Sequence, residues 1–266
     1  MRKHHILITN DDGINSPGLR AAVEAVKDLG IISVVAPRTQ QTGTGRGLTG
    51  NKQAALVPVE FMVEGAEVKA FSGEGSPALI VRHCLRTIFK DAKPDLLVSG
   101  INYGENLGFN VTSSGTVGAA LEASSFDIPA IAASLQTDVK YHHSYVELDW
   151  SAAIYFVNKF ARSLLSKESY PDVDVLKIDI PDAASPTTEW KMTRLARSFY
   201  YDRIIQESSA LSTFGDGKTI VRVDPDSLDH DSDIYALAVD KVVSITPLSL
   251  DLTSRVTLSD LHDFFT

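Results

Sequence analysis

The chain has 266 residues, of which 44% are hydrophobic, and a formal net charge of −9 at pH 7. This length suits one large domain or two modest ones. The negative charge argues against non-specific binding to nucleic acid or to anionic membranes, which depends on Lys and Arg. The single cysteine, Cys84, excludes an internal disulfide and suits a reducing compartment. Because no run approaches about 20 apolar residues and the start lacks a signal-peptide pattern, we expect a cytoplasmic protein.

Four apolar runs in the first half, each ended by polar residues, glycine or proline, predict strands buried on both faces of a parallel sheet. They are HILIT (5–9), ISVVAP (32–37), DLLVSG (95–100) and IPAIAAS (128–134). Helical spacing of apolar residues predicts helices over 17–29, 77–90 and 116–125. This alternation predicts a Rossmann-like α/β fold with a doubly wound, mostly parallel sheet. Ligands of such sheets bind beyond the carboxyl ends of the strands.

The second half continues with an amphipathic helix over 151–166 and a strand over 174–181. After Pro181 the chain becomes polar and hairpin-like, with KTIVRV (218–223) and KVVSITPL (241–248) on either side of an acidic stretch. We therefore expect a catalytic core over 1–181 and a smaller C-terminal hairpin and helix extension over 182–266.

Two adjacent aspartates, Asp11 and Asp12, follow the first predicted strand in ILITNDDGINSP. One interpretation is a sharp turn, because Asn, Asp and Gly tolerate the conformations that end a strand. The other is a metal site, because Mg²⁺ is commonly held by one or two carboxylates with waters and phosphate oxygens. Gly13 would let the backbone leave the strand so that both carboxylates converge.

Two further segments follow predicted strands or begin helices. SGINYGEN contains Asn102 and Asn106, and Asn102 offers a neutral oxygen ligand at the same sheet edge; the alternative is an ordinary loop. Ser114, Gly115 and Thr116 precede the predicted helix that runs to 125. They form either a plain N-cap or a phosphate cradle of backbone N–H groups and hydroxyls.

The segment 38–53, RTQQTGTGRGLTGNKQ, is almost devoid of apolar residues. It predicts a mobile loop with Leu48 as its lone anchor, either closing over a ligand or forming a plain surface loop. It lacks the Gly-Lys-Ser/Thr of a P-loop and the spacing of a dinucleotide fingerprint. No Gly-x-Ser-x-Gly nucleophile elbow occurs in the chain.

The blocks ILITNDDGINSPGL, PDLLVSGINYGENLG, SSGTVGAALEASSFDIPAIAAS and VVSITPL resemble, in order, the signature blocks of the survival protein SurE family. That family consists of metal-dependent phosphatases acting on nucleoside 5′- and 3′-monophosphates. The resemblance implies one divalent cation per subunit, Mg²⁺ or Mn²⁺. It also implies a homodimer or homotetramer in which a C-terminal extension is exchanged between subunits.

The resemblance further implies that Asp11, Asp12 and Asn102 are metal ligands, with Thr42 at the position of a fourth ligand that is usually Ser. Asn10, Ser114, Gly115 and Thr116 would surround the phosphate. The chain departs from the family pattern at Arg38, where Asp is common, at Leu79, where an acid is found, and at LKIDIP, where LNVNFP is typical.

The expected reaction is hydrolysis of a phosphomonoester of a nucleotide, with Asp11 as the base or the carboxylate that orients the nucleophile and Asp12 mainly as a ligand. Direct attack by water and a phospho-aspartyl route both remain open. One alternative is a phosphatase of the haloacid dehalogenase type, whose motif separates its two aspartates by one residue. Another is a nucleotide sensor that binds phosphate without hydrolysing it.

Overall fold

The computed structural model describes residues 3–142, 144–168 and 170–266. Its main feature is a nine-stranded sheet with the order β3-β4-β2-β1-β5-β6-β7-β11-β8. The strands of this sheet are β1 His4–Thr9, β2 Gly30–Pro37, β3 Val57–Val59, β4 Val68–Gly73, β5 Leu96–Tyr103, β6 Ala130–Leu135, β7 Val175–Ile180, β8 Trp190–Met192 and β11 Val243–Leu248. Only the β3–β4 and β7–β11 pairs are antiparallel. The predicted fold class, a doubly wound and mostly parallel sheet, is confirmed.

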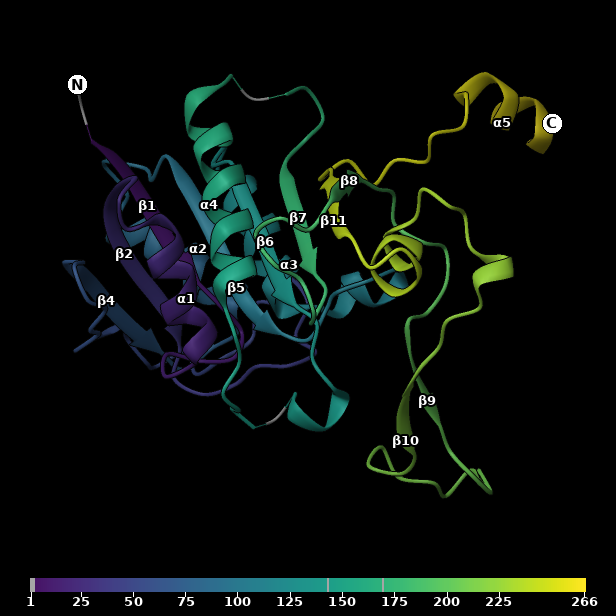
Figure 1. The fold of residues 1–266 in the computed structure, drawn as a ribbon. Helices are drawn as coiled ribbons and strands as arrows, with labels where there is room; N and C mark the ends of the chain where they lie inside the picture. The colour runs from purple at the N-terminus through teal and green to yellow at the C-terminus, as the bar shows by residue number, and fades with distance from the viewer. Residues whose placement is uncertain (1–2, 143, 169) are drawn as a thin grey trace.

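Four helices cover the two faces of the sheet (Figure 1). They are α1 Pro17–Val26, α2 Pro77–Thr87, α3 Gly115–Ser124 and α4 Ser151–Ser166. Helices α1 and α4 pack on one face and α2 and α3 on the other, each pair over its own apolar cluster. The shorter helical turns are Phe109–Ser113, Val139–Tyr141, Pro225–Ser227 and Tyr235–Val239. No described helix has the length and apolar character needed to cross a membrane.

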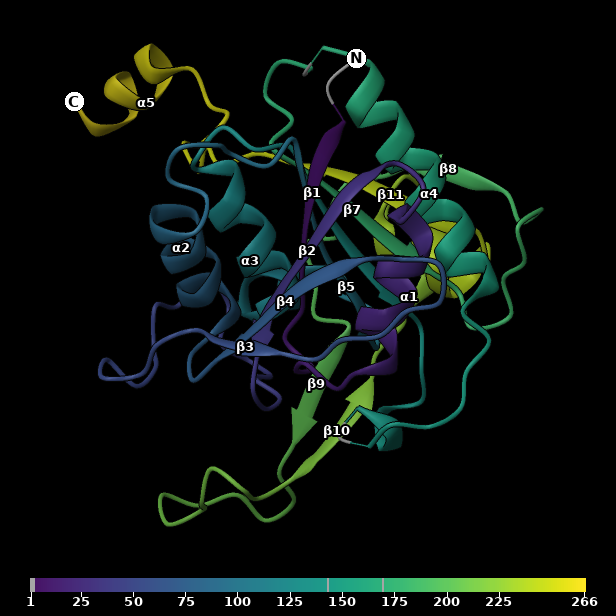
Figure 2. The ribbon, with the colours of Figure 1, turned by 90° about the vertical axis from the view of Figure 1, so that its left-hand side faces the viewer.

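The five predicted strands and four predicted helices all occur; α4 has the predicted bounds, and the other elements differ at one or both ends. Strands β3 and β4 were not predicted from the sequence. Val68 is half-buried and Lys69 is exposed, so VKAFSG lacks the continuous apolar run of the central strands. These two strands lie at one edge of the sheet, as the turned view of Figure 2 shows.

The C-terminal part both extends from the sheet and returns to it. A separate hairpin of β9 Tyr201–Ile204 and β10 Lys218–Val221 and the helix α5 Leu258–Phe265 project away from the body of the fold (Figure 1). The expectation that KVVSITPL is hairpin-like is wrong, because Val243–Leu248 forms β11 inside the main sheet between β7 and β8. Its side chains are buried at five of six positions, which a surface hairpin would not provide. The division at residue 181 stays a prediction.

A buried ionic cluster joins this returning segment to the core. Lys177 forms ion pairs with Asp179 and, at 3.2 Å, with Asp233, and all three side chains have no exposed surface. Asp233 also accepts hydrogen bonds from the backbone N–H groups of Gly108 and Ala196. The lysine of LKIDIP therefore supplies one positive charge to two buried carboxylates, and the backbone N–H groups bonded to Asp233 help to stabilise the remaining negative charge.

Candidate active site

The Asp11–Asp12 pair lies where β1 ends, in the sharp turn that the sequence predicts. Gly13 adopts φ +104°, a conformation that L side chains rarely take. The side chain of Asn10 closes the turn, donating to the carbonyl of Gly13 at 3.0 Å and accepting from its N–H at 3.2 Å. Both carboxylates are almost fully buried, with 6% of Asp11 and 3% of Asp12 exposed. The contact between Asn10 and phosphate stays a prediction.

Asp11 faces the first turn of α3. The hydroxyl of Thr116 donates to Asp11 Oδ1 at 2.5 Å. A Cβ on Gly115 would lie 2.7 Å from the Cβ of Asp11, so only glycine permits this approach. Burial raises the pKa of Asp11, although the hydrogen bond from Thr116 opposes the rise. Gly115 and Thr116 thus stand beside the aspartate pair, as expected for residues that share a site with it.

Asp12 is held from two other segments. Its Oδ1 accepts from the side chain of Gln40 at 3.2 Å, and its Oδ2 accepts from the backbone N–H of Tyr103 at 3.2 Å. Burial, followed by the charge of Asp11, raises the pKa of Asp12 to about 8. The sequence indicated neither Gln40 nor Tyr103, since nothing in their local pattern marks them as partners of a carboxylate.

Asn102 precedes Tyr103 on β5. Because the backbone N–H of Tyr103 donates to Asp12, Asn102 lies at the same sheet edge as Asp12. Its side-chain nitrogen donates to the carbonyl of Gly104 at 2.6 Å, so the oxygen is the atom that a cation would take. Asn106 has a structural role instead, donating from its backbone to Asp179 and from its side chain to Ser134.

Ser114 caps α3, since its hydroxyl accepts from the N–H of Val117 at 3.1 Å. The N-cap interpretation is therefore confirmed. The same helix start lies against Asp11, and a helix N-terminus attracts anions. The phosphate contacts of Ser114, Gly115 and Thr116 stay predictions.

The segment 38–53 is anchored by polar contacts, and the expectation that Leu48 is its lone anchor is wrong, because 40% of Leu48 is exposed. The N–H of Gly45 donates to the carbonyl of Ser113 at 2.9 Å. Arg46 pairs at 2.9 Å with the buried carboxylate of Glu122, which also binds Arg82. A backbone hydrogen bond and an ion pair thus bind this loop to α3 and to the turn before it.

Two hydroxyl residues of this loop differ in their placement. Thr42 is exposed, in a turn with Gly43, and its assignment as a metal ligand stays a prediction. Thr44 lies deeper: its hydroxyl is 3.0 Å from the point where a Cβ on Gly115 would stand, and Asp11 Oδ2 is 2.8 Å from the same point. Thr44 therefore brings a second hydroxyl to the neighbourhood of Asp11. Both threonines stand beside a glycine in the sequence, so the pattern alone did not distinguish them.

Residues 137–142 and 144–146 close another side of the site. Tyr145 donates its hydroxyl to the backbone carbonyl of Asp12 at 2.7 Å. Gln40 donates to the carbonyl of His142 at 2.7 Å as well as to Asp12. His142 in turn lies against Gly104, where its Nε2 is 2.6 Å from a Cβ position. The sequence pattern did not indicate His142 as part of this site.

Known proteins resemble this chain in sequence and in fold. The family model for survival protein SurE matches residues 6–202, about three quarters of the chain. The chain belongs to the survival protein SurE family. Proteins named 5′-nucleotidase SurE include those of Thermococcus kodakarensis, 40% identical over 97% of this chain and 96% of that protein, and Thermococcus gammatolerans, 37% identical over 97% and 94%. The crystal structure of SurE protein from Aquifex aeolicus matches with a TM-score of 0.77 and 28% identity, covering 98% of this chain and all of that one.

The donor atoms fit a hard divalent cation. Two buried carboxylates lie side by side, and within residues 3–142, 144–168 and 170–266 no Lys, Arg or His forms an ion pair with either. Buried charges ordinarily need such a partner or a metal. No group of three or more His, Cys, Asp or Glu side chains suitable for a metal occurs among the described residues. Neutral oxygens, such as those of Asn102 and a threonine, would have to complete the ligand set.

Proposed function

We propose that this chain is a phosphomonoesterase that hydrolyses nucleoside 5′- and 3′-monophosphates to nucleoside and phosphate, with one Mg²⁺ or Mn²⁺ per subunit. The observation that carries the proposal is the buried Asp11–Asp12 pair without a basic partner in the described structure, next to the N-terminus of α3. The membership in a family whose relatives are named 5′-nucleotidase supports the substrate class.

In this proposal Asp11, Asp12, Asn102 and Thr42 hold the cation. The bound cation would polarise the phosphoryl group and lower the pKa of a water molecule. Asn10, Ser114, Gly115 and Thr116 bind the phosphate oxygens through N–H and hydroxyl groups, which stabilises the charge that develops in the transition state. Asp11 orients the nucleophile, and its hydrogen bond from Thr116 keeps its carboxylate in one orientation.

The test is phosphate release from AMP with Mg²⁺ or Mn²⁺, compared with an EDTA control, followed by 3′-AMP and a panel of other phosphomonoesters. We expect release that depends on the added cation. If a broad panel gives no release above the control, the chain is a nucleotide sensor that keeps the fold without hydrolysis, and the proposal fails.

The proposed assembly is a homodimer or homotetramer built through the C-terminal extension. The β9–β10 hairpin and α5 project from the fold (Figure 2), and no side chain of α5 is buried. Phe264 is 78% exposed and Phe265 77%, and Phe214 beyond β9 is fully exposed. Apolar side chains gathered on projecting segments are typical of surfaces that are covered by a partner. Exchange of this extension between subunits would bury these phenylalanine side chains. We also propose that the protein is cytoplasmic.

A further inference from the structure

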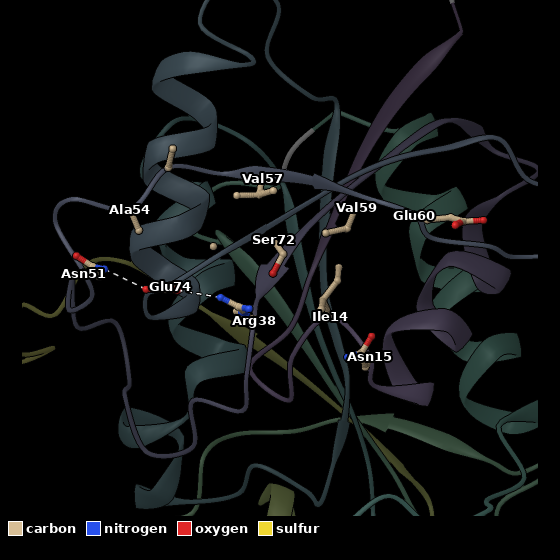
Figure 3. A pocket seen from close by; sticks show the side chains of 12 residues that line it. Ile14, Asn15, Arg38, Asn51, Ala54, Val57, Val59, Glu60, Ser72 and Glu74 are labelled. Carbon is tan, nitrogen blue, oxygen red and sulfur yellow. Dashed lines mark hydrogen bonds and ion pairs between the residues drawn. The ribbon is translucent and has the colours of Figure 1, made fainter.

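A groove of about 590 Å³ lies beside the aspartate turn, between segment 51–60 and the carboxyl ends of β2 and β4 (Figure 3). A smaller hollow of about 310 Å³ adjoins it and shares Arg38, Gly73 and Glu74 with it. The combined space falls in the size range of sites for small organic ligands, about 300–1,000 Å³. Neither hollow is lined by Asp11 or Asp12 themselves, so this space is separate from the metal ligands.

The chain connects both hollows directly to the aspartate pair. Ile14, two residues after Asp12, lines the larger groove and donates its N–H to the carbonyl of Pro37 at 2.8 Å. Gln41 lines the smaller hollow and donates its N–H to the carbonyl of Asp11 at 2.7 Å. Both hollows therefore adjoin the strand-end segment that carries the aspartate pair.

The charges in the groove do not favour a second anionic group. Arg38, the one basic side chain of the lining, donates to Glu74 at 3.1 Å, and Asn51 donates to the same carboxylate at 3.0 Å (Figure 3). Glu60 adds a further carboxylate on the far side. Two acids against one base disfavour a polyphosphate chain in this space.

The remaining lining suits an uncharged ring system. Ile14, Val57 and Val59 supply an apolar wall. Ser72 is 7% exposed, and its buried hydroxyl has no hydrogen-bond partner among the described residues. A buried hydroxyl without a partner is costly, so such a group at a cavity wall indicates a ligand that supplies the partner. Figure 3 draws Ser72 among Val57, Val59 and Arg38.

We propose that this groove binds the uncharged nucleoside part of the substrate, with its base against the apolar wall and a polar atom bonded to Ser72. The proposal rests on the proposed function, since it assumes a nucleoside phosphate as the substrate. In this proposal Arg38, which stands where the family pattern has Asp, forms with Glu74 an ion pair that lines the groove. It also limits the favoured substrates to monophosphates, because the groove does not neutralise additional phosphates.

The test fills the groove and leaves the aspartate turn unchanged. Val57 is 58% exposed, so Val57→Trp adds bulk to the groove wall without disturbing the core. Ile31 is a matched control, because it is also β-branched and is 52% exposed. It stands near the amino end of β2, whereas the groove lies at the carboxyl end of that strand. Calorimetric titration with adenosine, guanosine, cytidine and uridine measures binding without any need for turnover.

We expect the wild type to bind at least one nucleoside saturably, Val57→Trp to weaken that binding about tenfold or more, and Ile31→Trp to change it less than twofold. Equal binding by the two Trp variants, or no binding by the wild type, overturns the groove proposal. If Val57→Trp does not fold, Ser72→Ala decides: weaker nucleoside binding supports the groove and unchanged binding overturns it. Groove-dependent nucleoside binding without AMP turnover would leave the groove valid and reject the nucleotidase function.

Discussion

The side-chain amide of Gln40 bonds Asp12 Oδ1 at 3.2 Å and the carbonyl of His142 at 2.7 Å, and so ties a buried carboxylate to a surface segment. Such outer hydrogen bonds orient the groups that hold a metal, and their loss typically costs about 10–100-fold in affinity or activity. We expect Gln40→Ala to raise the Mn²⁺ concentration needed for half-maximal activity about tenfold.

The neighbouring Gln41 offers a control for this prediction, because its side chain bonds only Thr39 in the described structure. Gln41→Ala should leave the Mn²⁺ dependence of AMP turnover within twofold of wild type. A Gln40→Ala variant with the same Mn²⁺ dependence as Gln41→Ala would show that the bond to Asp12 does not support metal binding.

Replacing either aspartate should remove activity without unfolding the chain. Asp11→Asn and Asp12→Asn keep the shape of the side chain but remove a buried negative charge, so we expect both to abolish p-nitrophenyl phosphate turnover and to retain the native far-UV circular dichroism spectrum. Thermal melting in EDTA should show equal or greater stability than wild type, because two adjacent buried carboxylates repel each other. Activity of the double variant at the wild-type level would reject the site.

The protein's stability should depend on pH differently in the absence and in the presence of the metal. The pKa of Asp12 rises from its ordinary value of 3.8 to about 8, so the folded chain binds a proton more tightly than the unfolded chain does. Without metal, the contribution of Asp12 to the free energy of unfolding is fully present below pH 4 and is lost as pH rises toward 8. A cation binds only the ionised form, so the Mn²⁺-induced increase in melting temperature should grow from pH 5 to pH 8.

Scanning fluorimetry at half-unit pH steps, with EDTA or Mn²⁺, measures both effects. In Asp12→Asn the decline in EDTA should be shallower, because the group that titrates is absent. A wild-type melting temperature that climbs through pH 5–8 in EDTA, with Asp12→Asn following the same curve, would contradict this assignment.

Lys177 should be critical for stability. Removing it in Lys177→Met leaves the carboxylates of Asp179 and Asp233 buried without a cation, which we expect to cost about 3–5 kcal/mol in the free energy of unfolding. Lys140, whose ion pair with Asp138 is exposed, is the control and should change little when replaced by Met. Urea unfolding measures both variants, and equal midpoints would reject the structural role of the cluster.

The C-terminal helix should control assembly. Phe264→Asp combined with Phe265→Asp places charges on exposed apolar positions of α5, so it should shift the oligomer toward monomer while preserving the circular dichroism spectrum. Light scattering coupled to size-exclusion chromatography measures the mass. A mass for the double variant equal to that of the wild-type oligomer would show that α5 lies outside the interface.

Strands β1, β2, β5 and β6 could be predicted because strands covered on both faces by helices are apolar over most of their length. Strand β7 keeps apolar residues at four of its six positions, and the charges of Lys177 and Asp179 pair with each other inside the fold. The edge strand β3 and its neighbour β4 could not, since their partial exposure removes that pattern. The placement of Asp12 near Asn102 followed from the same reasoning, because neighbouring parallel strands present their carboxyl ends at one sheet edge.

The sequence by itself determined the central strands of the sheet, its four covering helices and the convergence of strand-end residues such as Asp12 and Asn102, since these depend on local periodicity and on the geometry of parallel strands. Only the tertiary structure decided which loop residues meet them. Gln40 reaches His142 across 102 positions of sequence, and Lys177 pairs with Asp233 across 56. Contacts of this kind depend on how whole segments pack. Isolated polar side chains belong to no periodic pattern, so the sequence does not indicate their partners.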